Sequence, residues 1–171
     1  EVKRQKETIN LIASENFVSK DVLEALGSAL TNKYSEGYPK KRYYAGNEII
    51  DQIEILAQER ARKVFRLAQH WHINVQPYSG SPANMAVYCA LLKPGEKIMG
   101  MSLETGGHLT HGHKVSITGK FWKQITYGVN RKTERLDYNE ILKIAQKEKP
   151  ALIIAGATAY PRKFDFQKFS R

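Results

Sequence analysis

The stretch that decides the fold is residues 73–101, which read INVQPYSGSPANMAVYCALLKPGEKIMGM. The apolar run at 73–77 predicts a short strand, and residues 79–92 predict a helix that a following proline–glycine pair stops. Residues 97–101 then predict a second strand. A strand, a helix and a further strand in this order are typical of a parallel sheet, because parallel neighbours need a crossover connection.

The same alternation continues on both sides of this stretch. Before it, apolar residues recur at helical spacing over about 19–30 and about 47–65. After it, strands are expected near 121–127 and 152–155, with a capped helix at about 138–147 between them. Short apolar strands that alternate with helices predict an α/β fold, a mostly parallel sheet flanked by helices.

Length and composition describe a globular chain. Of its 171 residues, 42% are hydrophobic and 26% are charged, which excludes a disordered chain. No apolar run approaches the roughly 20 residues that a membrane span needs. The single cysteine, Cys89, cannot form an internal disulfide and suits a reducing compartment, so we expect a cytoplasmic protein. An organellar form stays open, because the chain begins at Glu1 and a targeting segment could precede it.

The net charge of +10 is unevenly distributed. Residues 1–113 hold 14 basic and 12 acidic side chains, whereas residues 114–171 hold 13 and 5. The basic second part is compatible with a nucleic-acid-binding face, whose affinity would fall steeply with added salt. The lysines of this part are scattered, however, and its aromatic residues do not have the spacing of an RNA-binding motif. A solvated surface, or one part of a larger chain with acidic balance elsewhere, is the preferred interpretation.

The first candidate site is Ser79-Gly80-Ser81, at the expected start of a helix. Free backbone N–H groups and the positive end of the helix dipole suit an anion there, and glycine allows close approach. Alternatively, Ser79 or Ser81 only caps the helix. The segment is not a Walker loop, because the glycine–lysine–hydroxyl spacing is absent.

The second candidate is Gly106-Gly107-His108-Leu109-Thr110-His111-Gly112-His113. Three imidazoles within six residues are compatible with a metal site. No cysteine or carboxylate pair accompanies them, and the glycines indicate backbone packed close to a flat ligand. An imidazole that stacks on a ring is therefore at least as good an interpretation.

The third candidate is Tyr34-Ser35-Glu36-Gly37-Tyr38, followed by Lys41-Arg42-Tyr43-Tyr44. A carboxylate among phenols can transfer protons if desolvation raises its pKa. By itself, the segment favours the alternative of an aromatic interface in which Glu36 pairs with a surface cation.

Taken together, five blocks of sequence resemble serine hydroxymethyltransferase, and they occur in that family's order over nearly the whole chain. They are LIASEN at 11–16, NKYSEGYP at 32–39, RYY at 42–44, NVQPYSGS at 74–81 and GGHLTHG at 106–112. The resemblance implies a fold-type I transferase that uses pyridoxal 5′-phosphate. In one-carbon metabolism, this family interconverts serine plus tetrahydrofolate with glycine plus 5,10-methylenetetrahydrofolate. The cofactor ring takes up the electron pair left at the amino-acid α-carbon.

The resemblance also implies a domain organisation. Residues 1–46 would form an N-terminal helical arm that carries substrate and dimer-interface residues. Residues 47–171 would form an incomplete cofactor-binding part of the large domain. The partners implied are serine or glycine, the folate, and a second copy of the chain in a homodimer or higher oligomer.

For the cofactor, the resemblance implies contacts from several positions. Ser79, Gly80 and Ser81 would hold the phosphate, and His108 would stack on the pyridine ring. Thr158 would lie near the phenolic oxygen, where the family usually has a serine. Tyr34 would be a further cofactor contact, lent by the second subunit.

For the substrates, the resemblance implies a site shared between subunits. Ser14 would bind the amino-acid carboxylate, and the second subunit would lend Tyr34, Glu36 and Tyr44. Glu36 would transfer a proton at the serine hydroxyl and folate side, and with His108 it is the expected catalytic residue. The folate pocket would be lined by Leu103, Gly107 and Leu109. No metal ion is expected.

Three of the family's functional groups would lie C-terminal to residue 171: the Schiff-base lysine, the aspartate on the ring nitrogen and the carboxylate-binding arginine. Lys163 and Lys168 are not substitutes, because neither lies in the threonine-rich context of the family's lysine. We therefore expect an N-terminal portion of the enzyme that is inactive alone. A truncated paralogue that serves as an interaction or nucleic-acid-binding module is the alternative.

Overall fold

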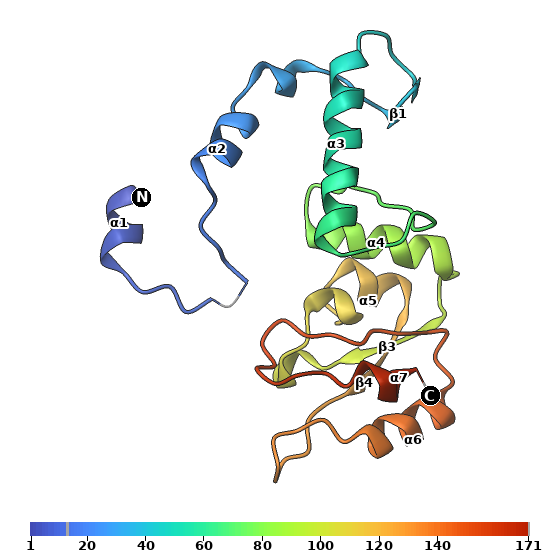
Figure 1. Cartoon of the computed structure of the whole chain (residues 1–171). Coiled ribbons are helices and arrows are strands. Elements are labelled where there is room, and N and C mark those ends of the chain that lie inside the picture. The colour runs from blue at the N-terminus through green and yellow to red at the C-terminus, as the bar shows by residue number, and fades with distance from the viewer. Residues whose placement is uncertain (13, 171) are drawn as a thin grey trace. The chain divides into compact units, whose positions relative to one another are not determined.

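The computed structural model describes residues 1–12 and 14–170, which divide into two compact units (Figure 1). One unit comprises residues 1–15 and 79–171, and the other comprises residues 16–78. The expected division at residue 46 concerns the whole protein and stays a prediction. Among the described residues, no helix is both long and apolar enough to cross a membrane.

The first unit is built on a parallel sheet of three strands in the order β4-β3-β5. Its helices and strands are α1 (Val2–Glu7), α4 (Gly80–Leu91), β3 (Lys97–Met101), α5 (Ile117–Phe121), β4 (Lys123–Tyr127), α6 (Tyr138–Glu148), β5 (Leu152–Ile153) and α7 (Phe166–Phe169). In the register of the sheet, Met99 lies between Ile125 and Ile153. The α/β class and the parallel sheet flanked by helices are therefore confirmed.

Side chains of the central strand β3 alternate between two apolar clusters on opposite faces of the sheet. Ile98 packs with Tyr88 of α4 and with Trp122. Met99 and Met101 pack in a second cluster that includes residues of α6 and α7. Figure 1 shows α4 and α6 on opposite sides of the strands. Burial on both faces explains why β3 carries no polar side chain after Lys97, instead of alternating apolar and polar residues.

The buried hydroxyl of Tyr127 ties the ends of β4 and β5 together. It donates a hydrogen bond of 2.6 Å to the carbonyl of Ile154, just beyond β5. Burial raises the pKa of Tyr127 to about 12, so this hydroxyl stays protonated at neutral pH. The carboxyl ends of the three strands are thereby held at one edge of the sheet.

The second unit contains α2 (Lys20–Leu26), the hairpin strands β1 (Gly37–Tyr38) and β2 (Lys41–Arg42), and α3 (Glu48–Val64). The helix expected at 47–65 is confirmed. The helix expected to extend to about residue 30 ends at Leu26 instead. There Gly27 follows, and the Ser28 hydroxyl donates to the Ala25 carbonyl and accepts from Leu30 N–H. A short 3₁₀ helix at Ala29–Asn32 replaces the last predicted turn, because Ser28 supplies a local hydrogen-bond alternative.

The prediction of a strand at 73–77 is wrong. The segment belongs to no strand, and none of the described strands pairs with it. The side chain of Asn74 instead accepts the Gln76 N–H at 2.9 Å, and Pro77 has no N–H to give. Local side-chain bonding therefore takes the place of a sheet ladder here.

Candidate cofactor and substrate site

Three segments of the first unit meet at the carboxyl edge of the sheet. The loop after β3 and the segment after β5 are joined at a single carbonyl, that of Gly106. It accepts the backbone N–H groups of Thr158 at 2.9 Å and Ala159 at 3.0 Å. Gly106 has φ +110°, and a Cβ there would lie 2.8 Å from Tyr160 N, so only glycine suits this position. Thr158 is thereby held beside the glycine–histidine loop.

The third segment is the start of α4. Ser79 is its N-cap residue in extended conformation, and its side chain makes no capping hydrogen bond. A Cβ on Gly80 would meet nothing within 4 Å. The capping alternative for Ser79 is therefore not what the structure shows. The N–H groups of Gly80 and Ser81, together with both serine hydroxyls, lie where an anion can bind.

A side-chain hydrogen bond ties the first turns of α4 to the loop after β3. Asn84 Nδ2 donates to Thr110 Oγ1 at 2.9 Å, and Thr110 Oγ1 lies 2.8 Å from His108 Nδ1. The start of α4 and the imidazole of His108 therefore belong to one hydrogen-bonded group.

His108 and His111 cap the same short 3₁₀ helix, Leu109–His111. Thr110 N–H donates to His108 Nδ1 at 3.1 Å, and His108 N–H donates to His111 Nδ1 at 3.3 Å. The two ring centroids lie 6.1 Å apart, with an angle of 60° between the ring planes. The spacing of these histidines is thus explained by reciprocal capping. Within residues 1–12 and 14–170, no group of three potential metal ligands is placed to hold an ion.

His111 is buried at 5% exposure beneath the loop. Burial lowers the pKa of His111 below its ordinary 6.5, and a hydrogen bond with the Met101 backbone offsets part of this shift. The ring packs on Gly100, where an added Cβ would lie 2.9 Å from His111 Cβ. A glycine in the central strand therefore makes room for this histidine.

The three positions expected to line a folate pocket are neighbours on this loop. Gly107 is buried, and a Cβ there would clash with the Met101 carbonyl oxygen. Leu103 and Leu109 flank it, with 40% and 41% of their surfaces exposed. Two apolar side chains thus border the glycine–histidine segment.

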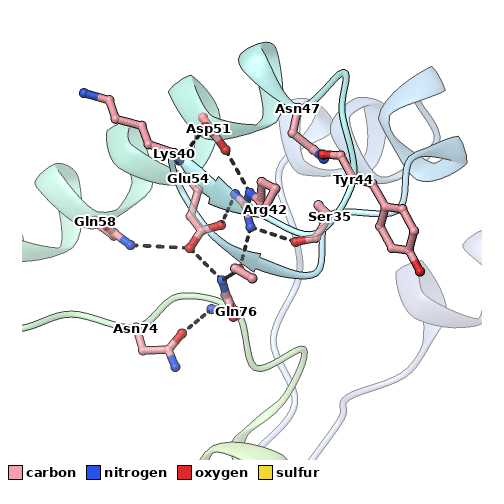
Figure 2. Close-up of polar contacts among 11 residues, drawn as sticks. Ser35, Lys40, Arg42, Tyr44, Asn47, Asp51, Glu54, Gln58, Asn74 and Gln76 are labelled. Atoms are coloured by element: carbon pink, nitrogen blue, oxygen red, sulfur yellow. Dashed lines mark hydrogen bonds and ion pairs between the residues drawn. The ribbon is translucent and has the colours of Figure 1, made fainter.

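In the second unit, a buried arginine organises the loop that carries Glu36. The side chain of Arg42 is 4% exposed and forms ion pairs with Asp51 at 2.8 Å and Glu54 at 2.6 Å. Its Nη1 also donates to the carbonyls of Ser35 at 2.7 Å and Gly37 at 2.8 Å, one on each side of Glu36 (Figure 2). Burial acts to lower the pKa of Arg42, but the hydrogen bonds with Glu54 and Asp51 outweigh it and raise the pKa.

Tyr34, Glu36 and Tyr44 come together around this arginine's loop. The rings of Tyr34 and Tyr44 lie 5.9 Å apart, and Tyr43 N–H donates to the Glu36 carbonyl at 3.1 Å. Tyr34 and Glu36 line a cavity of about 530 Å³ together with Arg42. Figure 2 shows the Tyr44 ring pointing away from the Arg42 cluster. The second unit thus gathers the three residues within one short stretch of backbone.

Ser14 belongs to the first unit. It is exposed in a turn in which Glu15 N–H donates to the Ile12 carbonyl at 3.1 Å. In the described part of the chain, no backbone hydrogen bond joins Ser14 to another expected site residue. Its expected contact with a substrate carboxylate stays a prediction.

Several residues important to this geometry are not identified by the sequence alone. Arg42 appears there only as part of a motif, and neither Asn84 nor Thr110 stands out as a site residue. A signal for Thr110 does exist in the His-x-x-His spacing around it, which matches the separation of N-cap and N3 positions in a capping box. No comparable local signal identifies Asn84, because its partner is 26 residues away.

The chain resembles known proteins of one family along its whole length. A family model described as serine hydroxymethyltransferase matches residues 1–171. A protein named serine hydroxymethyltransferase from Acidothermus cellulolyticus is 57% identical over 170 residues, which cover 99% of this chain and 39% of that protein. Relatives of the same name from Limosilactobacillus reuteri and Borrelia hermsii are each 59% identical, over 100% and 99% of this chain. The chain spans about 40% of the length of these curated relatives. It therefore belongs to the serine hydroxymethyltransferase family.

Proposed function

We propose that the full-length protein interconverts serine plus tetrahydrofolate with glycine plus 5,10-methylenetetrahydrofolate, using pyridoxal 5′-phosphate. The observation that carries the proposal is the uncapped start of α4, which Asn84 and Thr110 connect to the imidazole of His108. An anion site and a ring-stacking side chain in one group suit a flat, phosphorylated cofactor. The family match along the whole chain supports the same activity.

The residues at the start of α4 fit a phosphate. Ser79 and Ser81 contribute hydroxyls, and the Gly80 and Ser81 N–H groups lie at the positive end of a helix of 12 residues. The open space beside the Gly80 Cα lets a phosphate oxygen approach the backbone closely. Hydrogen bonds to a charged group contribute roughly 1.5–3 kcal/mol each, enough together to retain a cofactor.

When bound, pyridoxal phosphate supplies an electron sink for the bond that breaks at the amino-acid α-carbon. The residues of this chain bind and orient that group. Ser79, Gly80 and Ser81 would hold the phosphate, His108 would lie against the ring, and Thr158 would offer its hydroxyl to the phenolic oxygen. The Gly106 carbonyl accepts the Thr158 N–H, so Thr158 is attached to the same loop that carries His108.

For the substrates, we assign Ser14 to the amino-acid carboxylate and Glu36 to proton transfer at the serine hydroxyl. The folate would lie against Leu103, Gly107 and Leu109, whose half-exposed leucines offer apolar surface. The bound folate would exclude water from around Glu36, so that Glu36 would exchange a proton with the substrate hydroxyl and not with water.

We also propose a homodimer in the cytoplasm, in which each copy lends Tyr34, Glu36 and Tyr44 to the other's site. The second unit leaves much of its apolar surface exposed, including Ile49 at 60% and Val64 at 74% on α3. Exposed apolar area of this kind is typical of surfaces that are covered in an assembly. The alternative of an interaction or nucleic-acid-binding module has no support in the relatives that the chain matches.

Two sets of variants in the full-length protein test the proposal. Glu36→Gln should retain the cofactor, measured by its absorbance after gel filtration, but lose most folate-dependent turnover. Ser79→Ala combined with Ser81→Ala should lose cofactor retention first, with turnover partly restored by added cofactor. An unsubstituted protein that neither binds the cofactor nor cleaves serine would overturn the proposal. Loss of cofactor in Glu36→Gln would overturn the role of Glu36.

A further inference from the structure

Thr110 links the start of α4 to the imidazole of His108. It is buried at 4% exposure, and its hydroxyl contacts Asn84 Nδ2 at 2.9 Å and His108 Nδ1 at 2.8 Å. An amide nitrogen can only donate, so the Thr110 oxygen is the acceptor from Asn84. Tyr88 is a further hydrogen-bond partner of the Thr110 hydroxyl. The Tyr88 O–H can donate to the second lone pair of the Thr110 oxygen, which leaves the Thr110 hydrogen for His108 Nδ1.

His108 Nδ1 has a second donor in the backbone N–H of the same threonine, at 3.1 Å. A ring nitrogen that accepts hydrogen bonds must carry its lone pair, so the ring hydrogen of the neutral imidazole lies on Nε2. Two donors on one nitrogen also define the direction of the ring, because both come from a residue that the Asn84 side chain holds.

We infer that Thr110, oriented by Asn84, is a positioning residue that sets the ring direction and the Nε2–H tautomer of His108. The inference rests on the proposed function, in which this ring lies against pyridoxal phosphate. Asn84 lies on α4 about one turn beyond Ser79-Gly80-Ser81, so the same helix would hold the phosphate and, through Thr110, aim the stacking ring. The hydrogen bonds from Asn84 through Thr110 to His108 would therefore fix the position of the cofactor ring relative to its phosphate.

The tautomer can be measured without cofactor. In full-length protein labelled with ¹⁵N-histidine, solid-state NMR at pH 8 should show an Nε2-protonated ring for His108, assigned by its loss in His108→Gln. Thr110→Val removes the hydroxyl and keeps the backbone donor, so the signal should become a mixture of tautomers. Thr110→Ser restores the hydroxyl and should return the signal of the unsubstituted protein. An unchanged tautomer in Thr110→Val would overturn the inference.

Cofactor affinity gives the second readout. Thr110→Val should raise the dissociation constant for pyridoxal phosphate roughly two- to tenfold, the value of one ordinary hydrogen bond, while Thr110→Ser does not. Asn84→Asp keeps the size of the side chain but replaces the donor with an acceptor, so the Thr110 hydroxyl would turn towards it and away from His108. Equal affinity in Asn84→Asp and the unsubstituted protein would contradict the inference. If the unsubstituted protein shows the Nε2–H ring but binds no cofactor, the proposed function fails and the positioning of His108 stands.

Discussion

At the scale of single residues, His111 is a side chain that the fold holds in its neutral form. Its pKa is lowered by burial, so the unfolded chain binds a proton at a higher pH than the folded chain does. Stability from the neutral ring is present above the unfolded pKa of about 6.5 and is lost as the pH falls below it. We expect the thermal midpoint of the full-length protein to decrease from pH 7 to pH 5, because this group lowers the free energy of unfolding by up to about 1.4 kcal/mol per pH unit in that range.

The variant His111→Asn tests this assignment. The asparagine oxygen can accept the His108 N–H in place of Nδ1, but it does not titrate. Its thermal midpoint should be lower at pH 7 and depend less on pH between 7 and 5. His70→Asn, at an exposed position, is the matched control and should leave the pH dependence as it is. If both variants show the slope of the unsubstituted protein, another group is responsible for it.

Arg42 is the residue on which the Glu36 loop depends. Replacing it with methionine leaves Asp51 and Glu54 without their buried cation, and removing one member of a buried pair costs about 3–5 kcal/mol. We expect Arg42→Met to lower the free energy of unfolding by this amount, measured by urea denaturation. Lys41→Met, at the exposed neighbouring position, should change it by less than about 0.5 kcal/mol. Equal effects of the two substitutions would contradict the structural role of Arg42.

At the scale of elements, a substitution at the start of α4 should affect cofactor binding without affecting the stability of the fold. A Cβ at Gly80 meets nothing, so Gly80→Ala should leave the thermal midpoint unchanged or slightly raised. The methyl group would nevertheless occupy the approach to the backbone N–H groups. We expect cofactor affinity to fall roughly ten- to a hundredfold, the loss of one charge-assisted hydrogen bond, as measured by absorbance titration.

Gly100→Ala is the contrasting variant. Its Cβ would lie 2.9 Å from His111 Cβ, so it should destabilise the protein by about 1–3 kcal/mol through overpacking. If Gly80→Ala instead destabilises the protein and binds the cofactor normally, the anion site has been placed wrongly.

The elements that sequence periodicity predicts well are those whose apolar pattern is complete within one stretch of chain. The helix α3 and the strand β3 carry such unbroken patterns, and both lie where they are expected. The segment at 73–77 has the composition of a strand, but pairing depends on a neighbour that local sequence does not specify. The Ser79-Gly80-Ser81 site can be argued from helix-terminus chemistry alone. The Asn84–Thr110 contact cannot, because it joins residues from different elements.

At the scale of the whole molecule, the shared site can be tested by mixing subunits. One full-length chain carries Glu36→Gln, and the other carries Ser79→Ala with Ser81→Ala. Random pairing makes about half of the dimers mixed, and each mixed dimer would hold one intact site of two. We expect roughly a quarter of the original turnover, above the residual turnover of each variant alone, after the two proteins are unfolded and refolded together at limiting cofactor, because random pairing restores that share of the sites. Sites formed within single chains would give no recovery.

The carbonyl of Gly106 has a consequence for how this family can diverge. Because one oxygen receives two successive amides from a segment far downstream, we expect the number of residues between the end of β5 and Thr158 to be constrained. A one-residue insertion or deletion there would displace the hydroxyl of Thr158 from the imidazole loop, so natural selection should remove such length variants.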